Sequence, residues 1–315
     1  MVLLTLVGAE LGVRAFYSAP APMLDKTRAY AARPHGQAPE LLVFGTCLPE
    51  QIIQTQALGE QLGLEVSNLA TPAGTARLFY LVLKHHIPQD AEIQAIVLPF
   101  GTRDLSKEMA PHESQVMALA PWSEMPNLMR WACPDDSSCA SELLLRKSSY
   151  AYRNRGYIAN KVWMSIGVRE PIPGYVLSPG AIAPPQDGAA PPPPKAKPAA
   201  EPSLDGELLA EPAGGPDPEF QYLHRFLLLA KARNIPVMLV PLPTRADFET
   251  GRAPDPTQAE YQARLQATIS AGGGTLLQVT DIPGLGAQDF TDDVHLSQEG
   301  RAKVTAALGR AMSGS

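Results

Sequence analysis

The sequence is poor in charged residues, in aromatic residues and in cysteine. Charged side chains make up 18% of the 315 residues and aromatic side chains 6%, whereas an average soluble domain carries about 25% charged residues. Three cysteines are too few to build a disulfide scaffold, and their spacing is not that of a zinc ribbon. No apolar run reaches the roughly 20 residues of a complete membrane span. These shortages exclude a small disulfide-rich fold.

Positive charge is also scarce. The net charge of −6 and the lack of a basic cluster argue against a nucleic-acid-binding protein. A hydrophobic content of 45%, however, is enough to bury a real core, which excludes disorder of the whole chain. Proline is in clear excess, with 32 copies, about twice the usual share.

The first 22 residues have the composition of a membrane anchor helix and its exit. Residues 1–9 are mostly apolar, Glu10 and Arg14 follow, and a proline-broken stretch closes the segment. No basic region precedes the apolar run, as it would in a signal peptide. We interpret residues 1–22 as the last part of an anchor helix, which would place the rest in the periplasm or outside a bacterial cell. The alternative is an amphipathic first helix of the globular domain.

Short apolar runs alternate with helical patterns on both sides of a long interruption. This alternation is typical of an α/β fold with a mostly parallel sheet between two layers of helices. Strands are predicted at residues 41–45, 65–69, 94–99, 236–241 and 275–279. Helices are predicted at residues 49–63, 76–86, 219–233, 257–271 and 297–312, with Gly63 ending the first and Ser297 capping the last.

The sequence therefore predicts one α/β domain built from residues 40–104 and 219–315. Residues 105–179 are expected to form an inserted helical subdomain. Residues 180–218 are rich in proline and alanine, and with so few large apolar side chains we expect a disordered linker.

Two cysteines flank a turn-forming stretch within the predicted insertion. Cys133 and Cys139 are six residues apart, a separation that a disulfide can bridge across a tight turn. In an oxidising compartment they would close a small loop. The alternative is two unrelated thiols in a surface loop.

Chemically useful residues follow several predicted strands. Asp292 stands three residues before His295, close enough to hold the imidazole and fix its tautomer, although a simple surface turn has the same pattern. Cys47 follows the first strand on the turn that leads into a helix, where backbone N–H groups would lower the pKa of its thiol. Because the carboxyl ends of parallel strands share one edge of the sheet, we expect these residues to meet.

Two further segments complete this set. Asn68 and Gly74 bound a loop after the second strand, where a glycine lets a backbone N–H approach a substrate oxygen. Arg103 and Asp104 follow the third strand in the run Gly-Thr-Arg-Asp. Arg103 could donate charged hydrogen bonds to an oxyanion or an anionic substrate, or pair with Asp104.

The order of these blocks resembles the SGNH (GDSL-type) hydrolase family. Its first block is matched by Gly45-Thr46-Cys47, its second by Gly74, its third by Gly101 to Asp104, and its last by Asp292 and His295. The sequence is most similar to the envelope-anchored branch, which includes the D-alanine transfer protein of teichoic acids and alginate acetylation proteins. The resemblance implies a three-layer, flavodoxin-like domain and covers roughly 160 residues outside the insertion.

Two departures from the family pattern put activity in doubt. Cys47 stands where the family has its nucleophilic serine, and Arg103 where it has an oxyanion-binding asparagine. A Cys47–His295–Asp292 triad would still suit an esterase or acyltransferase acting on an acylated glycopolymer of the cell envelope, with no metal and no cofactor. The alternative is an SGNH-fold protein that has lost catalysis and binds a glycan or a membrane partner. Nucleic acid is not an expected partner.

Overall fold

The computed structural model describes residues 10–15, 21–33, 39–72, 74–101, 104, 113–133, 137–165, 217–245, 256–277 and 282–314. The chain divides into two compact units, each made from two stretches of sequence. One unit combines Met1–Pro22 with Glu113–Ala196, and the other combines Met23–His112 with Lys197–Ser315. Each unit is described by itself below.

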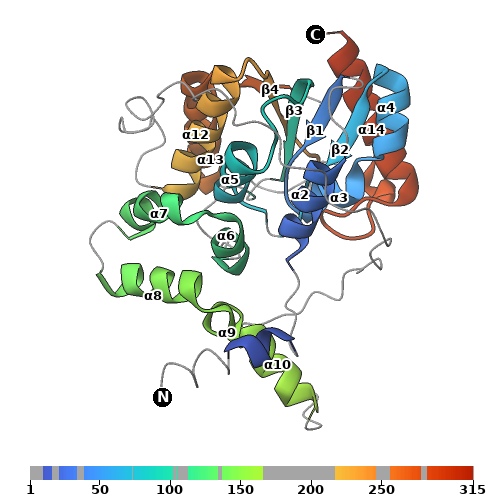
Figure 1. The fold of residues 1–315 in the computed structure, drawn as a ribbon. Coiled ribbons are helices and arrows are strands. Elements are labelled where there is room, and N and C mark those ends of the chain that lie inside the picture. Colours follow the sequence, from blue (N-terminus) through green and yellow to red (C-terminus); the bar gives the residue numbers. More distant parts are fainter. Residues whose placement is uncertain are drawn as a thin grey trace, which may run out of the picture. The chain divides into compact units, whose positions relative to one another are not determined.

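The second unit contains a five-stranded sheet in which every pair of neighbouring strands is parallel (Figure 1). The strand order is β2-β1-β3-β4-β5. The α/β fold and the joining of both predicted halves in one sheet are confirmed, because β4 pairs directly with β3. The strands are β1 Glu40–Val43, β2 Glu65–Asn68, β3 Ile93–Phe100, β4 Val237–Pro241 and β5 Thr275–Leu276.

Helices cover both faces of this sheet, which gives three layers (Figure 1). One face carries α5 Ala76–His85, α12 Pro218–Ala232 and α13 Pro256–Gly272. The other carries α3 Cys47–Ile52, α4 Thr55–Leu62 and α14 Gln298–Ser313. A further helix, α2 Pro22–Ala32, precedes the first strand. As predicted, Gly63 ends α4 in the left-handed conformation, with φ 66°, and the Ser297 side chain caps α14.

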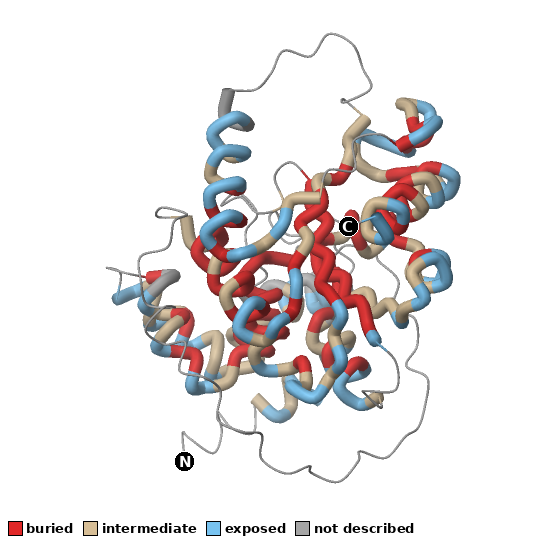
Figure 2. The backbone as a smooth tube through the Cα atoms, turned by 90° about the horizontal axis from the view of Figure 1, so that it is seen from above, coloured by how far each residue is buried: buried red, intermediate tan, exposed pale blue. Residues whose placement is uncertain are grey.

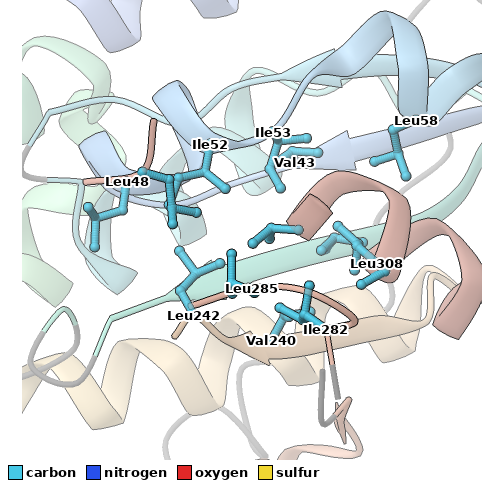
Figure 3. Close-up of a cluster of buried hydrophobic side chains, with 14 of the residues drawn as sticks. Val43, Leu48, Ile52, Ile53, Leu58, Val240, Leu242, Ile282, Leu285 and Leu308 are labelled. Carbon is cyan, nitrogen blue, oxygen red and sulfur yellow. The ribbon is translucent and has the colours of Figure 1, made fainter. Parts of the chain in front are cut away.

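Side chains alternate between two cores because successive residues of a strand point to opposite faces. On one face Phe44, from the end of β1, packs against Phe79 and Phe226 with ring centroids 5.7 and 5.5 Å away. On the other face Val43 and Val240 meet aliphatic side chains such as Leu58 of α4 and Leu308 of α14 (Figure 3). Buried residues are therefore concentrated on the strands and on the sheet-facing sides of the helices (Figure 2).

The single helix predicted for residues 49–63 is wrong. The chain forms α3 and α4 instead, with Ile53 extended between them at φ −80°, ψ 113°. Thr305 of α14 compensates the break, since its hydroxyl donates to the Ile52 carbonyl at 3.3 Å and accepts from the Gln54 N–H at 3.2 Å. The break also brings Ile53 into the core, where its side chain is 5% exposed.

The predicted linker, residues 180–218, lies outside the described residues except at its end. There Asp217 caps α12 by accepting from the Glu219 N–H at 3.0 Å, and Pro218 occupies the first turn. A proline is tolerated in that position because its missing N–H would have no helical partner. The helix thus begins one residue earlier than predicted.

All the described secondary-structure elements of the first unit are helices. Residues 10–15 are helical, and the inserted stretch forms a series of short helices. These are α6 Glu113–Leu119, a 3-10 turn η1 Trp122–Glu124, α7 Met125–Ala132, α8 Ser137–Ser148, α9 Tyr150–Arg153 and α10 Arg155–Ser165. Cys133 and Cys139, which join the end of α7 to α8, are disulfide-bonded with a Cα–Cα separation of 5.6 Å.

The N-terminal segment belongs with these inserted helices. The Glu10 carboxylate accepts hydrogen bonds from the Ser149 hydroxyl at 3.0 Å and from the backbone N–H groups of Tyr150 and Ala151. Glu10 therefore caps α9. Residues 1–9, which hold most of the predicted anchor, lie outside the described residues, and no described helix is long and apolar enough to cross a bilayer.

Because Phe44 and Phe79 come from one half of the sheet domain and Phe226 from the other, the stability of each half should depend on the other. We expect Phe226→Ala to lower the free energy of unfolding by about 3–5 kcal/mol, because it empties a fully buried site against Phe44 and Phe79. Urea unfolding followed by circular dichroism measures this. Lys231→Ala, on an exposed position of the same helix, should change stability by less than about 0.5 kcal/mol. Equal stability of both variants would contradict a core shared by residues from β1, α5 and α12.

Candidate active site at the carboxyl edge of the sheet

The candidate site residues lie on segments that leave the sheet at the carboxyl ends of its strands. Hydrogen bonding continues briefly past the strand ends, with the Leu69 N–H donating to Val43 at 2.7 Å and the Leu242 N–H to Phe100 at 2.8 Å. These bonds fix where each loop begins. In open α/β sheets this carboxyl edge is where ligands bind.

The first of these loops turns sharply at Gly45. Its φ of 143° lies in a region that favours glycine, and a Cβ there would lie 2.4 Å from Pro49 Cγ. Thr46 then caps α3, accepting from the Leu48 N–H at 3.4 Å. The sharp turn places Cys47, which is half-buried, at the first position of α3, two residues before the predicted start of the helix.

Asp104 approaches this turn from the loop after β3. Its Oδ2 accepts the Thr46 hydroxyl hydrogen at 2.8 Å and the Gly101 N–H at 2.8 Å. The carboxylate thereby ties the loop after β3 to the loop after β1. Arg103, its predicted ion-pair partner or oxyanion donor, lies outside the described residues.

The environment of Cys47 contradicts the predicted low thiol pKa. Burial raises the pKa of the Cys47 thiol above its ordinary value, and the carboxylates of Asp104 and Glu50 raise it further. The N–H groups at the start of α3 act in the opposite direction but are outweighed. The sequence pattern correctly predicted a helix next to Cys47, but the charges of Asp104 and Glu50 come from contacts that it did not consider.

Asn68 and Gly74 use their polar groups within the fold. The Asn68 amide donates to the Pro49 carbonyl at 3.3 Å, and its oxygen accepts from the Ala70 N–H at 3.0 Å. The Gly74 N–H, predicted to face a substrate oxygen, donates to the Thr71 carbonyl at 2.9 Å. These residues shape the loop after β2 rather than presenting open donors.

The Asp292–His295 pair is formed. His295 Nδ1 lies 2.7 Å from Asp292 Oδ2, and Asp292 Oδ1 accepts the N–H groups of Val294 and His295 at 2.9 and 2.8 Å. These backbone bonds, with the imidazole, lower the pKa of Asp292 to about 2. An ionised carboxylate cannot donate, so Nδ1 carries the hydrogen.

This tautomer leaves His295 Nε2 as a proton acceptor. Within the part of the chain that the structure describes, no group hydrogen-bonds to Nε2. The loop is held in place at both ends, since the Thr291 N–H donates to the His295 carbonyl at 2.8 Å and the Arg245 N–H to the Asp293 carbonyl at 2.9 Å. The site thus contains an oriented base.

Cys47 and His295 lie on segments that pack against the same hydrophobic cluster. Cys47 begins α3, and His295 lies just before α14, which contacts α3 through the Thr305 hydroxyl and Ile52. Leu48, next to Cys47, belongs to the same buried cluster as Phe290 and Leu296, which flank the Asp292–His295 loop. The two segments thus pack against one cluster, but among the described residues no hydrogen bond or ion pair joins the Cys47 thiol to His295.

Sequence reasoning missed Lys26. Its ammonium binds the Glu50 carboxylate at 2.7 Å and the Ala70 carbonyl, so α2 is tied to the loops that carry Cys47 and Asn68. No local pattern around a lysine on α2 indicates such distant partners. Among the described residues, no group of three or more His, Cys, Asp or Glu side chains could hold a metal ion.

No protein-family model matches this chain, and no curated protein matches it in sequence. Three solved bacterial structures are similar, each at 12% identity. One is described as an acylhydrolase, from Bacteroides fragilis, with a TM-score of 0.46 over 94% of this chain and 99% of that one. The others are a GDSL-like lipase from Bacteroides thetaiotaomicron (0.42; 93% and 98%) and a protein described as a platelet activating factor from Streptococcus pneumoniae (0.40; 97% and 98%). Likeness at this level assigns no function to this chain.

The Asp292 carboxylate should stabilise the fold only where it is ionised. Its folded-state pKa of about 2 lies below the ordinary 3.8, so its contribution is complete above the ordinary value and is lost as pH falls towards about 2. We expect the stability advantage of wild type over Asp292→Asn to be constant above pH 5 and to shrink between pH 4 and 2. Urea unfolding across this range measures it, and an advantage that grew on acidification would contradict the assignment.

The Cys47 thiol should react more slowly with iodoacetamide at pH 7 than a free cysteine does, because a raised pKa leaves less thiolate. Asp104→Asn removes a nearby negative charge and should speed the reaction several-fold. Glu92→Gln, an exposed substitution elsewhere in the sheet domain, serves as the control. Labelling by mass spectrometry reports on Cys47 because the other two cysteines are bonded to each other. A fast labelling rate that is the same in the wild type and in Asp104→Asn would contradict this electrostatic explanation.

Proposed function

We propose that this protein is an esterase or acyltransferase of SGNH type, with Cys47 as nucleophile, His295 as general base and Asp292 as its orienting carboxylate. The observation that carries the proposal is the 2.7 Å bond from His295 Nδ1 to an ionised Asp292. That bond leaves His295 Nε2 without a hydrogen-bond partner among the described residues, so Nε2 could accept the proton of a nucleophile. The order of the sequence blocks gives independent support.

The reaction would proceed in two acyl-transfer steps. The Cys47 sulfur attacks the ester carbon while His295 Nε2 takes the thiol proton, and the imidazolium then returns that proton to the departing alcohol. A thioester to Cys47 remains. Water, or the hydroxyl of an acceptor, attacks it with His295 again taking the proton, which releases the acyl group and restores the thiol.

The raised thiol pKa determines which form of cysteine catalysis is proposed. Because burial and the carboxylates of Asp104 and Glu50 raise the pKa of the Cys47 thiol, a preformed thiolate is not the proposed attacking species. His295 would instead remove the proton as the sulfur attacks, as it would from a serine hydroxyl. Of the predicted oxyanion donors, the Gly74 N–H is occupied, so the Cys47 N–H and Arg103 would carry that role.

The proposed substrate is an acylated glycopolymer of the bacterial cell envelope. The protein would be attached through its N-terminal segment, with the sheet domain facing the periplasm or the exterior. This part rests on the similarity to the envelope-anchored branch and on the apolar residues 1–9. The Cys133–Cys139 disulfide is in keeping with an oxidising compartment.

A second candidate is a protein of the same fold that has lost catalysis and binds a glycan or a membrane partner. The raised pKa of Cys47 and the engaged Gly74 N–H favour it, since both depart from what an active site of this family would need. The oriented His295 favours catalysis, because a binding protein has no use for a fixed tautomer there.

Hydrolysis of p-nitrophenyl acetate and butyrate distinguishes the two candidates. We expect Cys47→Ala and His295→Gln each to lower kcat/KM by about 10³-fold or more, and Asp292→Asn by about 10²–10⁴-fold. Cys47→Ser should keep measurable activity, because His295 can also activate a hydroxyl.

Lys231→Ala, which is remote from the site, should behave as wild type. Acyl-Cys47, detected by intact-mass analysis after a rapid quench, would identify the nucleophile directly. Unchanged activity in Cys47→Ala would remove Cys47 from the mechanism. Inactivity of both the wild type and Cys47→Ser would favour the binding protein.

A further inference from the structure

A positive charge lies beside the first turn of α3, the turn that begins with Cys47. Lys26 Nζ of α2 is 2.7 Å from Glu50 Oε1 and also donates to the Ala70 carbonyl. Glu50 is three residues after Cys47 on the same helix, and residues at this spacing lie on one side of a helix. The ammonium therefore contacts a carboxylate that is itself a neighbour of the thiol.

Lys26 completes a ring of hydrogen bonds between α3 and the loop after β2. The Asn68 amide donates to the Pro49 carbonyl at 3.3 Å, and its oxygen accepts from the Ala70 N–H at 3.0 Å. Lys26 then joins the Ala70 carbonyl to the carboxylate of Glu50, the residue after Pro49. The loop is thus bound to the first turn of α3 at two points, and one of them is an ion pair.

The helix that carries Lys26 is fixed in position. Met23, Thr27 and Tyr30 of α2 are buried, and they recur at the spacing of one helix face. At the other end of α2 the Tyr30 hydroxyl donates to Glu40 of β1 at 2.8 Å. Because the backbone of Lys26 is already held near α3, its ion pair loses less freedom than a pair between two mobile surface residues.

The two carboxylates that raise the pKa of the Cys47 thiol, those of Asp104 and Glu50, have different partners. Asp104 accepts from two neutral donors of neighbouring loops, and these leave its charge unbalanced. Glu50 binds the Lys26 ammonium, which balances its charge. The contribution of Glu50 to the environment of the thiol therefore depends on Lys26.

Other titratable groups lie on elements around α3. His295 and Asp292 are on the loop before α14, which contacts α3 through the bond from its Thr305 hydroxyl. Residues 68–72, in the loop after β2, carry no charge, and Arg103 lies outside the described residues. None of these groups differs among the variants below, so their effect on the thiol is the same in each.

We propose that Lys26 is a positioning residue for Cys47: it balances the charge of Glu50 and holds the first turn of α3 to the loop after β2. The ammonium takes no part in bond making. It acts through Glu50 and Ala70 on where the thiol lies and on how readily the thiol loses its proton. A role of Lys26 in ester cleavage rests on the proposed function, whereas its effect on the thiol does not.

The rate at which iodoacetamide alkylates Cys47, measured from about pH 6 to about pH 10 around the ordinary thiol pKa, tests the proposal. Lys26→Met leaves Glu50 unbalanced and should raise the apparent pKa of the thiol. The rate at neutral pH should then fall about two- to fivefold, the effect of one unit charge at a partly exposed site. Glu50→Gln should increase the rate by a similar factor.

The double substitution Lys26→Met plus Glu50→Gln restores the charge balance, so its rate should return close to that of wild type. Lys26→Arg keeps the charge and should also stay near wild type. The matched control is Arg264→Met, which removes the cation of the Arg264–Glu260 pair on α13 and should change nothing at Cys47. Circular dichroism confirms that each variant is folded.

Equal rates in wild type and Lys26→Met would overturn the proposal. A double variant as slow as Lys26→Met would also overturn it, because a lysine needed only for packing would not be rescued by the loss of a second side chain. Hydrolysis of p-nitrophenyl acetate separates this inference from the proposed function. In an active wild type, Lys26→Met should lower kcat/KM and the double substitution should recover it. An inactive wild type would contradict the proposed function, and the alkylation rates would still decide the role of Lys26.

Discussion

The carboxyl edge of the sheet depends on the close approach of two backbone segments at Gly45 and Gly74. A Cβ on Gly74 would lie 2.5 Å from the Gly45 carbonyl oxygen, and that same oxygen accepts the Thr71 N–H at 3.0 Å. A side chain at Gly74 would separate the loops after β1 and β2, and one at Gly45 would collide with Pro49 and with the Pro99 carbonyl of β3. With the loops in contact, α3 can begin immediately at the sheet edge, and Thr46 can reach Asp104.

Two carboxylates then give the site opposing electrostatic tendencies. Asp292 is held ionised by backbone N–H groups and orients an imidazole, which favours proton abstraction. Asp104 joins the loops after β1 and β3 through its hydrogen bonds, but its negative charge disfavours a thiolate at Cys47. The charge of Asp104 would affect a serine nucleophile less, because a serine hydroxyl stays protonated until it attacks. The electrostatics therefore suit a neutral nucleophile activated during attack.

The sequence was most informative where local patterning decides structure. Apolar runs located all five strands, and Ser297 and Gly63 located helix ends, because burial and capping depend on neighbouring residues. The predicted helix over 49–63 failed because Thr305, far along the chain, stabilises its break. The prediction of a low pKa for Cys47 was wrong for a similar reason, since the burial of the thiol and its proximity to Asp104 both arise from tertiary structure. Lys26 gave no local signal of any kind.

The strand order has a consequence for how this chain reaches its native state during synthesis. β3 lies in the middle of the sheet, but β4, its partner on one side, is separated from it by residues 101–236. Until those residues have left the ribosome, a long apolar strand exposes an unpaired edge, the kind of edge that pairs with other chains. Whether the nascent chain aggregates should therefore depend on how quickly residues 101–236 are translated. It should also depend on whether another protein or segment covers the edge of β3 until β4 pairs with it.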